Sequence, residues 1–344
     1  MLTDRIEASW LDAFEVVLRL CQASPGMPVC LLGESQSRAL NLDLAELAAL
    51  RLGCRPFRCI LPTPATTAPV PVRSTGASRA LGGHPAVLAA LAASPLILDL
   101  TLEGLLHATE LPAILKAGSR VMMVSNEHPE ALARLVPRPE DEAPVKAAVK
   151  RARAAQRMHV TSAAGTDLQV AMAGAVTAGV WGWTDRPGTV AHWPGGVVVS
   201  FPRAGSVNGT LVLDAGDVNL TFKRYLESPV RLTLVDDYVT EIAGAGTDAE
   251  LMRRYLAAWG DPVAYAVSHV GWGMNPRARY EALAMYGQRD TNGTELRAFA
   301  GNFLFSTGAN EFAGRFTEGH FDIPVRGCTI TLDGDPVVVE GRLA

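Results

Sequence analysis

The sequence predicts an α/β protein with two domains: an N-terminal parallel α/β domain over residues 1–140 and a C-terminal mixed, strand-rich α+β domain over residues 141–344. Three observations support this prediction. Helical stretches alternate with short apolar strands up to about residue 135, a Pro- and acid-rich segment at 137–142 breaks the alternation, and the chain beyond it is rich in strands and glycine. With 344 residues, 48% of them hydrophobic, the chain is long enough to bury a sizeable core.

The first domain is predicted from periodicity, with Thr3 or Asp4 as the cap of a first helix that runs to about residue 20. Short apolar runs predict strands at 29–32, 58–61, 96–99 and 121–125. Helical spacing predicts helices at 42–52, 85–93 and 110–117. Residues 33–37 lack the glycine spacing of a nucleotide-binding turn, and residues 62–78 are typical of a long surface loop.

The second domain is predicted to begin with a helix at 143–156. Strands are expected at 159–162, 167–171, 196–201 and 209–213, with hairpins at 231–242 and 328–343. The hairpin turns are expected at Asp236-Asp237 and at residues 333–336. Helices are expected at 248–259 and 277–286.

Composition excludes several classes of partner. The net charge is -4 and the basic run at 150–153 is short, so nucleic acid is not expected to bind. No apolar stretch approaches roughly 18 residues, and acidic residues stand where a signal peptide would be basic, so neither a membrane span nor export is expected. Five cysteines, an odd number without a Cys-x-x-Cys pair, indicate reduced thiols in a cytoplasmic protein. The expected assembly is a homo-oligomer.

His320 and Asp322 are the residues that point most directly to chemistry. Residues two apart on a strand project from the same face, so this imidazole and this carboxylate can bind one metal ion. His269, in a glycine-rich segment, is the best candidate for a third ligand. Two histidines and one carboxylate with open coordination positions are typical of non-haem Fe(II) oxygenases, whereas zinc hydrolases use similar ligands. The triad by itself leaves the metal open.

Serine hydrolysis is the obvious rival chemistry. The chain has no Gly-x-Ser-x-Gly nucleophile elbow, and Ser306 follows an apolar strand without a neighbouring base in the sequence. We therefore do not expect a serine nucleophile.

The same residues resemble a known family. Residues 268–278 (SHVGWGMNPRA), 301–308 (GNFLFSTG) and 320–324 (HFDIP) are similar to the 2,5-dihydroxypyridine 5,6-dioxygenases of bacterial nicotinate degradation. Residues 192–196 (HWPGG) and 209–214 (GTLVLD) add to the resemblance. It implies that His269, His320 and Asp322 bind one Fe(II), and that the enzyme is an extradiol-type dioxygenase that opens a hydroxylated pyridine, 2,5-dihydroxypyridine or a close analogue, with O2.

The resemblance also implies roles for further residues. His107 and His192 match histidines that line the pocket, and either imidazole is a candidate acid or base. Arg297 and Ser306 match substrate-contacting positions, where the guanidinium can pair with an oxyanion. The alternatives are a helix-start cap for His107 and an interdomain salt bridge for Arg297.

One position departs from the family pattern. A carboxylate of the resembling enzymes that contacts the polar edge of the ring maps onto Val180. Loss of a hydrogen-bond acceptor leaves a polar group of the ring unsatisfied, at a cost of about 1–3 kcal/mol. Either another acceptor replaces it or the substrate differs at that edge.

The fold expected from this resemblance is shared with the aminopeptidase T group of dinuclear metallopeptidases. Two metal-binding glutamates of that group map onto Val197 and His269, and its further histidine falls at 302–304, where this chain has none. Two bridged cations need several anionic ligands, so one metal is expected. A metallo-aminopeptidase-like hydrolase on the same scaffold is the alternative function.

Overall fold

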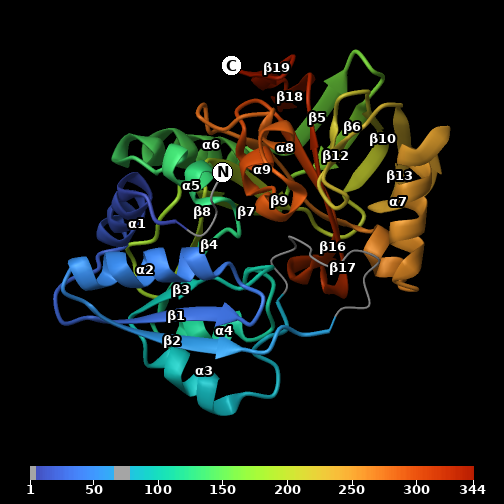
Figure 1. Cartoon of the computed structure of the whole chain (residues 1–344). Coiled ribbons are helices and arrows are strands. Elements are labelled where there is room, and N and C mark those ends of the chain that lie inside the picture. The colour runs from blue at the N-terminus through green and yellow to red at the C-terminus, as the bar shows by residue number, and fades with distance from the viewer. Residues whose placement is uncertain (1–4, 66–77) are drawn as a thin grey trace.

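A computed structural model describes residues 5–65 and 78–344 of the chain. It contains a parallel sheet of five strands, antiparallel sheets of eight and five strands, and a two-stranded pair (Figure 1). The predicted combination of a parallel α/β part with a strand-rich mixed part is confirmed. None of the helices in the described ranges is long and apolar enough to cross a membrane.

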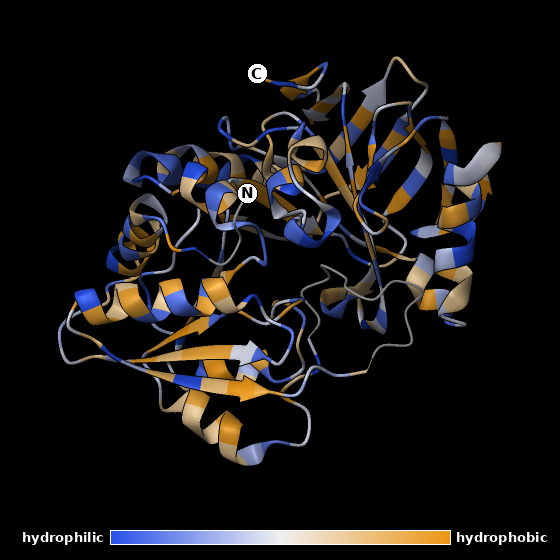
Figure 2. Ribbon diagram, in the orientation of Figure 1, coloured by the Kyte–Doolittle hydropathy of each residue, from blue (hydrophilic) through white to orange (hydrophobic). Residues whose placement is uncertain are grey.

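The parallel sheet has the strand order β2-β1-β3-β4-β8. Its strands are β1 (Pro28–Glu34), β2 (Arg55–Leu61), β3 (Leu96–Asp99), β4 (Arg120–Val124) and β8 (Val190–Trp193). Every residue of β3 and β4 is buried, as expected of a sheet that is covered on both faces. Helices α1 (Ala8–Leu20) and α2 (Ala39–Arg51) pack on one face, and α3 (Pro85–Ala92) and α4 (Leu111–Lys116) on the other. Figure 2 shows the hydrophobic residues concentrated in these strands.

Most elements of this part match the prediction to within a few residues. Helix α1 begins at Ala8 after Glu7, and the predicted caps Thr3 and Asp4 lie outside the described residues, as does most of the loop predicted at 62–78. Strand β8 was not predicted. It pairs in parallel with β4 although it follows residue 140 in sequence, and the domain boundary at that residue stays a prediction.

The two antiparallel sheets form the strand-rich part. The larger has the order β14 (Tyr238–Ala243), β13 (Val230–Val235), β10 (Val207–Leu213), β6 (Asp167–Ala171), β5 (Arg157–Ser162), β18 (Cys328–Leu332), β19 (Asp335–Val339) and β20 (Arg342–Leu343). The smaller has the order β17 (Arg315–Val325), β16 (Phe303–Asn310), β15 (Val267–Gly273), β9 (Val197–Phe201) and β7 (Val176–Val180). The pair is β11 (Val218–Asn219) and β12 (Arg224–Tyr225). Helices α6 (Glu142–Ala154) and α7 (Gly246–Ala258) confirm the predicted helices at 143–156 and 248–259.

Turn chemistry explains the hairpin between β13 and β14. Asp236 and Asp237 have φ angles of 46° and 77°, so both central residues of this two-residue turn are left-handed, as the favoured hairpin turn requires. The second predicted hairpin joins β18 to β19 in the same way, with Asp333 at φ 52° and Gly334 at φ 96°. Both predicted hairpins are confirmed.

The helix predicted at 277–286 is wrong over most of its length, since only α8 (Ala282–Met285) forms there. The preceding backbone forms turns instead, with the N–H of Ala278 donating to the carbonyl of Asn275 at 3.3 Å and the N–H of Ala282 donating to the carbonyl of Arg279 at 3.3 Å. Glu295 accepts from the N–H of Arg279 at 2.7 Å. Helices α5 (Pro129–Arg134) and α9 (Thr294–Ala298) and four 3-10 turns were not predicted. The turns are η1 (Pro139–Asp141), η2 (Pro262–Tyr265), η3 (Gln288–Asp290) and η4 (Glu311–Ala313).

Candidate metal centre

Strand alternation places two of the predicted ligands on one face of the smaller antiparallel sheet. Phe321 and Ile323 of β17 belong to the core between the two antiparallel sheets. Because successive side chains point to opposite faces, His320 and Asp322 project from the other face of β17. That face is the one that the loop after β3 approaches, since the His107 ring lies 5.5 Å from the His320 ring.

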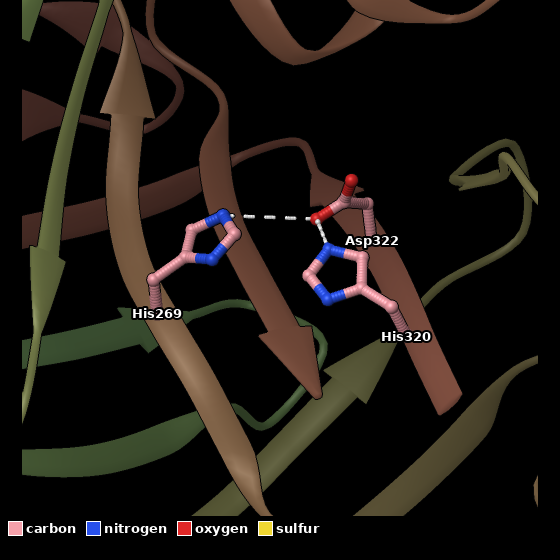
Figure 3. Close-up of side chains that lie close together, drawn as sticks. All are labelled: His269, His320 and Asp322. Atoms are coloured by element: carbon pink, nitrogen blue, oxygen red, sulfur yellow. Dashed lines mark hydrogen bonds and ion pairs between the residues drawn. The ribbon is translucent and has the colours of Figure 1, made fainter. Parts of the chain in front are cut away.

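A register shift turns His269 toward the same face. Val267 and Val270 of β15 both belong to the core although they are three residues apart, and the pairing with β16 is irregular between them. Bulges of this kind redirect a side chain next to an active site. Figure 3 shows the consequence: the side chain of His269 from β15 points toward those of His320 and Asp322 from β17.

The donor atoms of the three side chains lie at distances that fit one ion. Asp322 Oδ1 is 3.1 Å from His320 Nε2 and 3.7 Å from His269 Nε2, and one ligand atom from each residue lies within 4.8 Å of the others. Bonds of about 2.1 Å at right or tetrahedral angles separate neighbouring donors by roughly 3.0–3.4 Å. Among the described residues, these three side chains form the one group of three or more His, Cys, Asp or Glu residues whose ligand atoms lie close enough together to hold an ion. All three are buried.

Protonation in the folded chain suits metal binding. Burial lowers the pKa of His269 to about 3 although the Asp322 carboxylate acts against it, so the imidazole is neutral and has a lone pair to donate. Burial opposes ionisation of Asp322, but the Arg297 guanidinium and the His320 imidazole outweigh it and hold the pKa of this carboxyl well below its usual range. The site therefore offers neutral imidazole and a carboxylate anion.

Ser306 and Arg297 surround the carboxylate. Ser306 on β16 lies opposite Asp322 in the register, and its hydroxyl donates to Asp322 Oδ1 and lies 3.0 Å from His269 Nε2. Arg297 on α9 donates from Nε to Asp322 Oδ2 at 2.5 Å. Both matched positions are therefore within the site, in contact with a predicted ligand. Both members of this ion pair lie within residues 141–344, so the pair itself is not the interdomain salt bridge considered from sequence.

His107 approaches the triad from the parallel sheet. It lies in the loop after β3, with ring centroids 5.5 Å from His320 and 6.5 Å from His269. The Nδ1 atom of His107 lies 3.4 Å from Oε1 of Glu311. Its position at the carboxyl end of a parallel strand is where α/β sheets bind ligands.

His192 is held as a neutral imidazole at the end of β8. Its Nδ1 donates to the carbonyl of Pro194 at 2.6 Å, which leaves Nε2 without its proton. Burial lowers the pKa of His192 to about 4, with the positive charge of Arg297 acting in the same direction. The charges of Arg297 and Asp322, which form an ion pair at the metal centre, both act on this imidazole.

Val180 is not brought to the triad. It pairs with Val197, which pairs with Gly273, and Gly273 in turn donates to the carbonyl of Asn302. Asn302 is four residues before Ser306 along β16, so Val180 is displaced from the row of the triad by about 13 Å. It packs instead near the core under α1 and α2. No contact in the described residues supports the substrate contact implied by the resemblance.

Sequence analysis missed the residues that hold these groups in place. Asp99, at the end of β3, accepts from the hydroxyl of Thr101 at 2.6 Å and from the N–H of Leu105 at 2.8 Å, and so orders the loop that carries His107. Glu311 stands next to His107 in space. Asp99 is the last residue of a buried strand and Glu311 directly follows one, and an acidic residue at such a strand end was the signal for each of them.

Comparison with known proteins agrees with this geometry. Residues 9–344 match the family model of 2,5-dihydroxypyridine 5,6-dioxygenases, NicX. The 2,5-dihydroxypyridine 5,6-dioxygenase of Pseudomonas putida is 37% identical over 338 residues, which cover 97% of this chain and 95% of the relative. The solved structure of the 2,5-dihydroxypyridine dioxygenase from this species has a TM-score of 0.91 at 36% identity, covering 99% of this chain and 98% of the other.

A second solved structure, wild-type AmpT from Thermus thermophilus, has a TM-score of 0.60 at 15% identity, covering 98% of this chain and 99% of the other. At that identity the likeness shows a shared fold alone. Both resemblances predicted from the sequence motifs are confirmed.

Proposed function

Because the chain belongs to the 2,5-dihydroxypyridine 5,6-dioxygenase family, we propose that it is an Fe(II)-dependent, extradiol-type dioxygenase that opens the ring of 2,5-dihydroxypyridine or a close analogue. The observation that carries the proposal is the convergence of His269, His320 and Asp322 on one point. The small aromatic substrate and O2 are its partners. We place the enzyme in the cytoplasm, where its five free thiols stay reduced, and expect a homo-oligomer.

Iron is the metal that this donor set favours in a dioxygenase. Two imidazoles and one carboxylate are the donor set of non-haem Fe(II) oxygenases, and here His269, His320 and Asp322 would hold the ion. Bound Fe(II) would supply the redox chemistry that dioxygen requires. Hydrolytic zinc sites use similar ligands, so the support for iron comes from the family together with the donor set.

The surrounding residues then bind and orient the ring. Arg297 pairs with the Asp322 carboxylate, and the positive charge of its guanidinium attracts an anionic oxygen of the substrate. The Ser306 hydroxyl, which contacts both Asp322 and His269, is a second polar group against which the substrate can bind. Both residues act by orienting an electron-rich, deprotonated ring.

His107 and His192 are positioned to move protons. Deprotonation of the ring hydroxyl needs a neutral imidazole near the metal centre, and burial keeps His192 in that form with Nε2 free to accept. The His107 ring lies 5.5 Å from that of His320 and 6.5 Å from that of His269. With two further imidazoles, one can take the hydroxyl proton while the other donates a proton to the developing product.

The alternative, a metallo-aminopeptidase-like hydrolase, is not favoured. The related peptidase shares the fold at low identity, whereas the 37% identical relative is named as a dioxygenase. The described residues offer one cluster that suits a single ion. A bridged pair of cations would need further carboxylates to offset their repulsion.

Anaerobic reconstitution tests the proposal. Protein stripped of metal is loaded with Fe(II) under nitrogen, mixed with 2,5-dihydroxypyridine, and exposed to air in an oxygen electrode. We expect uptake of one O2 for each ring opened and no uptake by a Zn(II)-loaded sample. Oxygen-independent hydrolysis of a peptide or amide, with no Fe(II)-dependent uptake, would instead establish the hydrolase.

A further inference from the structure

The His107 ring is fixed on a rigid loop. Asp99 accepts from the backbone N–H groups of Thr101 and Leu105 at 3.1 and 2.8 Å, and Thr101 in turn accepts from the N–H of Gly104 at 3.1 Å. Asp99, Thr101 and Leu105 are buried. Hydrogen bonds therefore hold the loop after β3 as far as Leu105, whose carbonyl accepts from the N–H of Ala108 at 3.0 Å, so the backbone is held on both sides of His107. The ring of that side chain can still rotate, and either ring nitrogen can carry the proton.

The carboxylate of Glu311 lies beside that ring. His107 Nδ1 lies 3.4 Å from Glu311 Oε1, while the same ring lies 5.5 Å from the His320 ring. Phe201 contacts the ring edge-on, with centroids 6.3 Å apart. A ring flipped by 180° would present a carbon to the carboxylate, so this contact selects one ring orientation.

The carboxylate is itself held in place. Glu311 begins the turn η4, and the buried side chain of Asn310 accepts from the N–H of Ala313 at 3.1 Å and donates to the carbonyl of Pro202 at 2.9 Å. The next residue, Phe312, packs on Phe201 with ring centroids 5.2 Å apart. Glu311 thus approaches His107 from a turn anchored on both sides.

We propose that Glu311 is a positioning residue: its carboxylate accepts the Nδ1–H of His107 and so leaves Nε2 unprotonated and directed to the metal centre. A carboxylate that fixes the tautomer and orientation of a working histidine is a recurrent device in enzymes. The inference rests on the proposed acid–base role of His107 and adds the group that prepares it for proton transfer.

The first measurement does not depend on turnover. In ¹⁵N-histidine-labelled protein, with or without Zn(II), the His107 nitrogens report which of them carries the proton. We expect the Nδ1–H tautomer in the wild type and in Glu311→Gln, whose amide oxygen still accepts, and a mixture of tautomers in Glu311→Ala. An Nε2–H tautomer in the wild type, or no change in Glu311→Ala, would overturn the proposal.

The second measurement is kinetic. We expect Glu311→Ala to lower kcat by about 10- to 100-fold, with KM within about twofold and iron content unchanged, and Glu311→Gln to recover most of the loss. In a His107→Gln background, Glu311→Ala should have no further effect, because the two residues act as one unit. Equal losses in both backgrounds would show that Glu311 acts independently of His107.

Controls separate this inference from the proposed function. Glu241→Ala, at an exposed glutamate on β14 in the other antiparallel sheet, should leave kcat and the His107 spectrum unchanged. A wild type that consumes no oxygen with any hydroxypyridine would refute the proposed function and leave the tautomer measurement intact. Full turnover by His107→Gln would refute the acid–base role, and Glu311 would then have no histidine to prepare.

Discussion

Glu127 is a buried carboxylate that joins the parallel sheet to the helix that carries Arg297. It follows β4, and its Oε2 accepts from the backbone N–H of Asn292 at 2.7 Å. Its Oε1 accepts from the N–H groups of Gly293 and Thr294 at 2.8 and 3.0 Å. These are donors at the start of α9 that the helix itself cannot satisfy. Replacement of Glu127 by Gln changes one oxygen into an NH2 group at almost constant volume.

The expected cost follows from these contacts. The new NH2 faces the Asn292 N–H, so one hydrogen bond to a charged acceptor is lost, at about 1.5–3 kcal/mol. The two bonds to the remaining oxygen lose their charge assistance, at roughly 1 kcal/mol. Burial raises the pKa of Glu127, so removal of the buried charge offsets part of the loss. We expect a net local destabilisation of about 2 kcal/mol, which corresponds to roughly 30-fold in an opening equilibrium.

Hydrogen exchange measured by mass spectrometry tests this prediction. Amides of residues 292–295 should lose about 10- to 100-fold of their protection in Glu127→Gln, since local opening of α9 controls their exchange. The matched control is Glu130→Gln in the same segment, whose carboxylate is 37% exposed and pairs with Arg134 at 3.7 Å, for which we expect less than about 0.5 kcal/mol. Unchanged protection at 292–295 in Glu127→Gln would refute the reasoning.

Three further predictions concern the site. His320→Ala should abolish iron retention and oxygen uptake together, measured by metal analysis and an oxygen electrode; retained activity would rule out this ligand. Burial lowers the pKa of His192 from 6.5 to about 4. Between these two pH values the unfolded chain binds a proton at His192 that the folded chain does not bind, so the free energy of unfolding falls as the pH falls. Relative to His192→Gln, the wild type should lose about 2 kcal/mol of unfolding free energy between pH 7 and 5 in urea titrations, and parallel pH profiles would argue against a buried neutral imidazole. Val180→Glu should leave turnover of 2,5-dihydroxypyridine unchanged, because the register of β7 holds it away from the triad, and improved turnover would restore the contact implied by the family resemblance.

Local pattern was sufficient for much of the fold. The alternation of apolar strands and helices predicted the parallel sheet, and the paired aspartates at 236–237 predicted a hairpin whose turn has the expected left-handed residues. The prediction failed at residues 277–286, where the backbone forms turns and only residues 282–285 are helical. Glu295, from a later element, accepts from the N–H of Arg279 in this segment, a contact that no local pattern reveals.

The sequence by itself determined that His320 and Asp322 share one face, because a period of two is a property of any strand. Only the tertiary structure decided that His269 joins them, since its direction depends on a register shift between β15 and β16 that no local pattern announces. The same holds for His107 and Glu311, which are separated by some two hundred residues. They meet because the loop after β3 of the parallel sheet packs against the end of β16 in the smaller antiparallel sheet. Local backbone geometry depends on neighbouring residues in the sequence, whereas contact between side chains that are distant in sequence depends on how whole sheets pack.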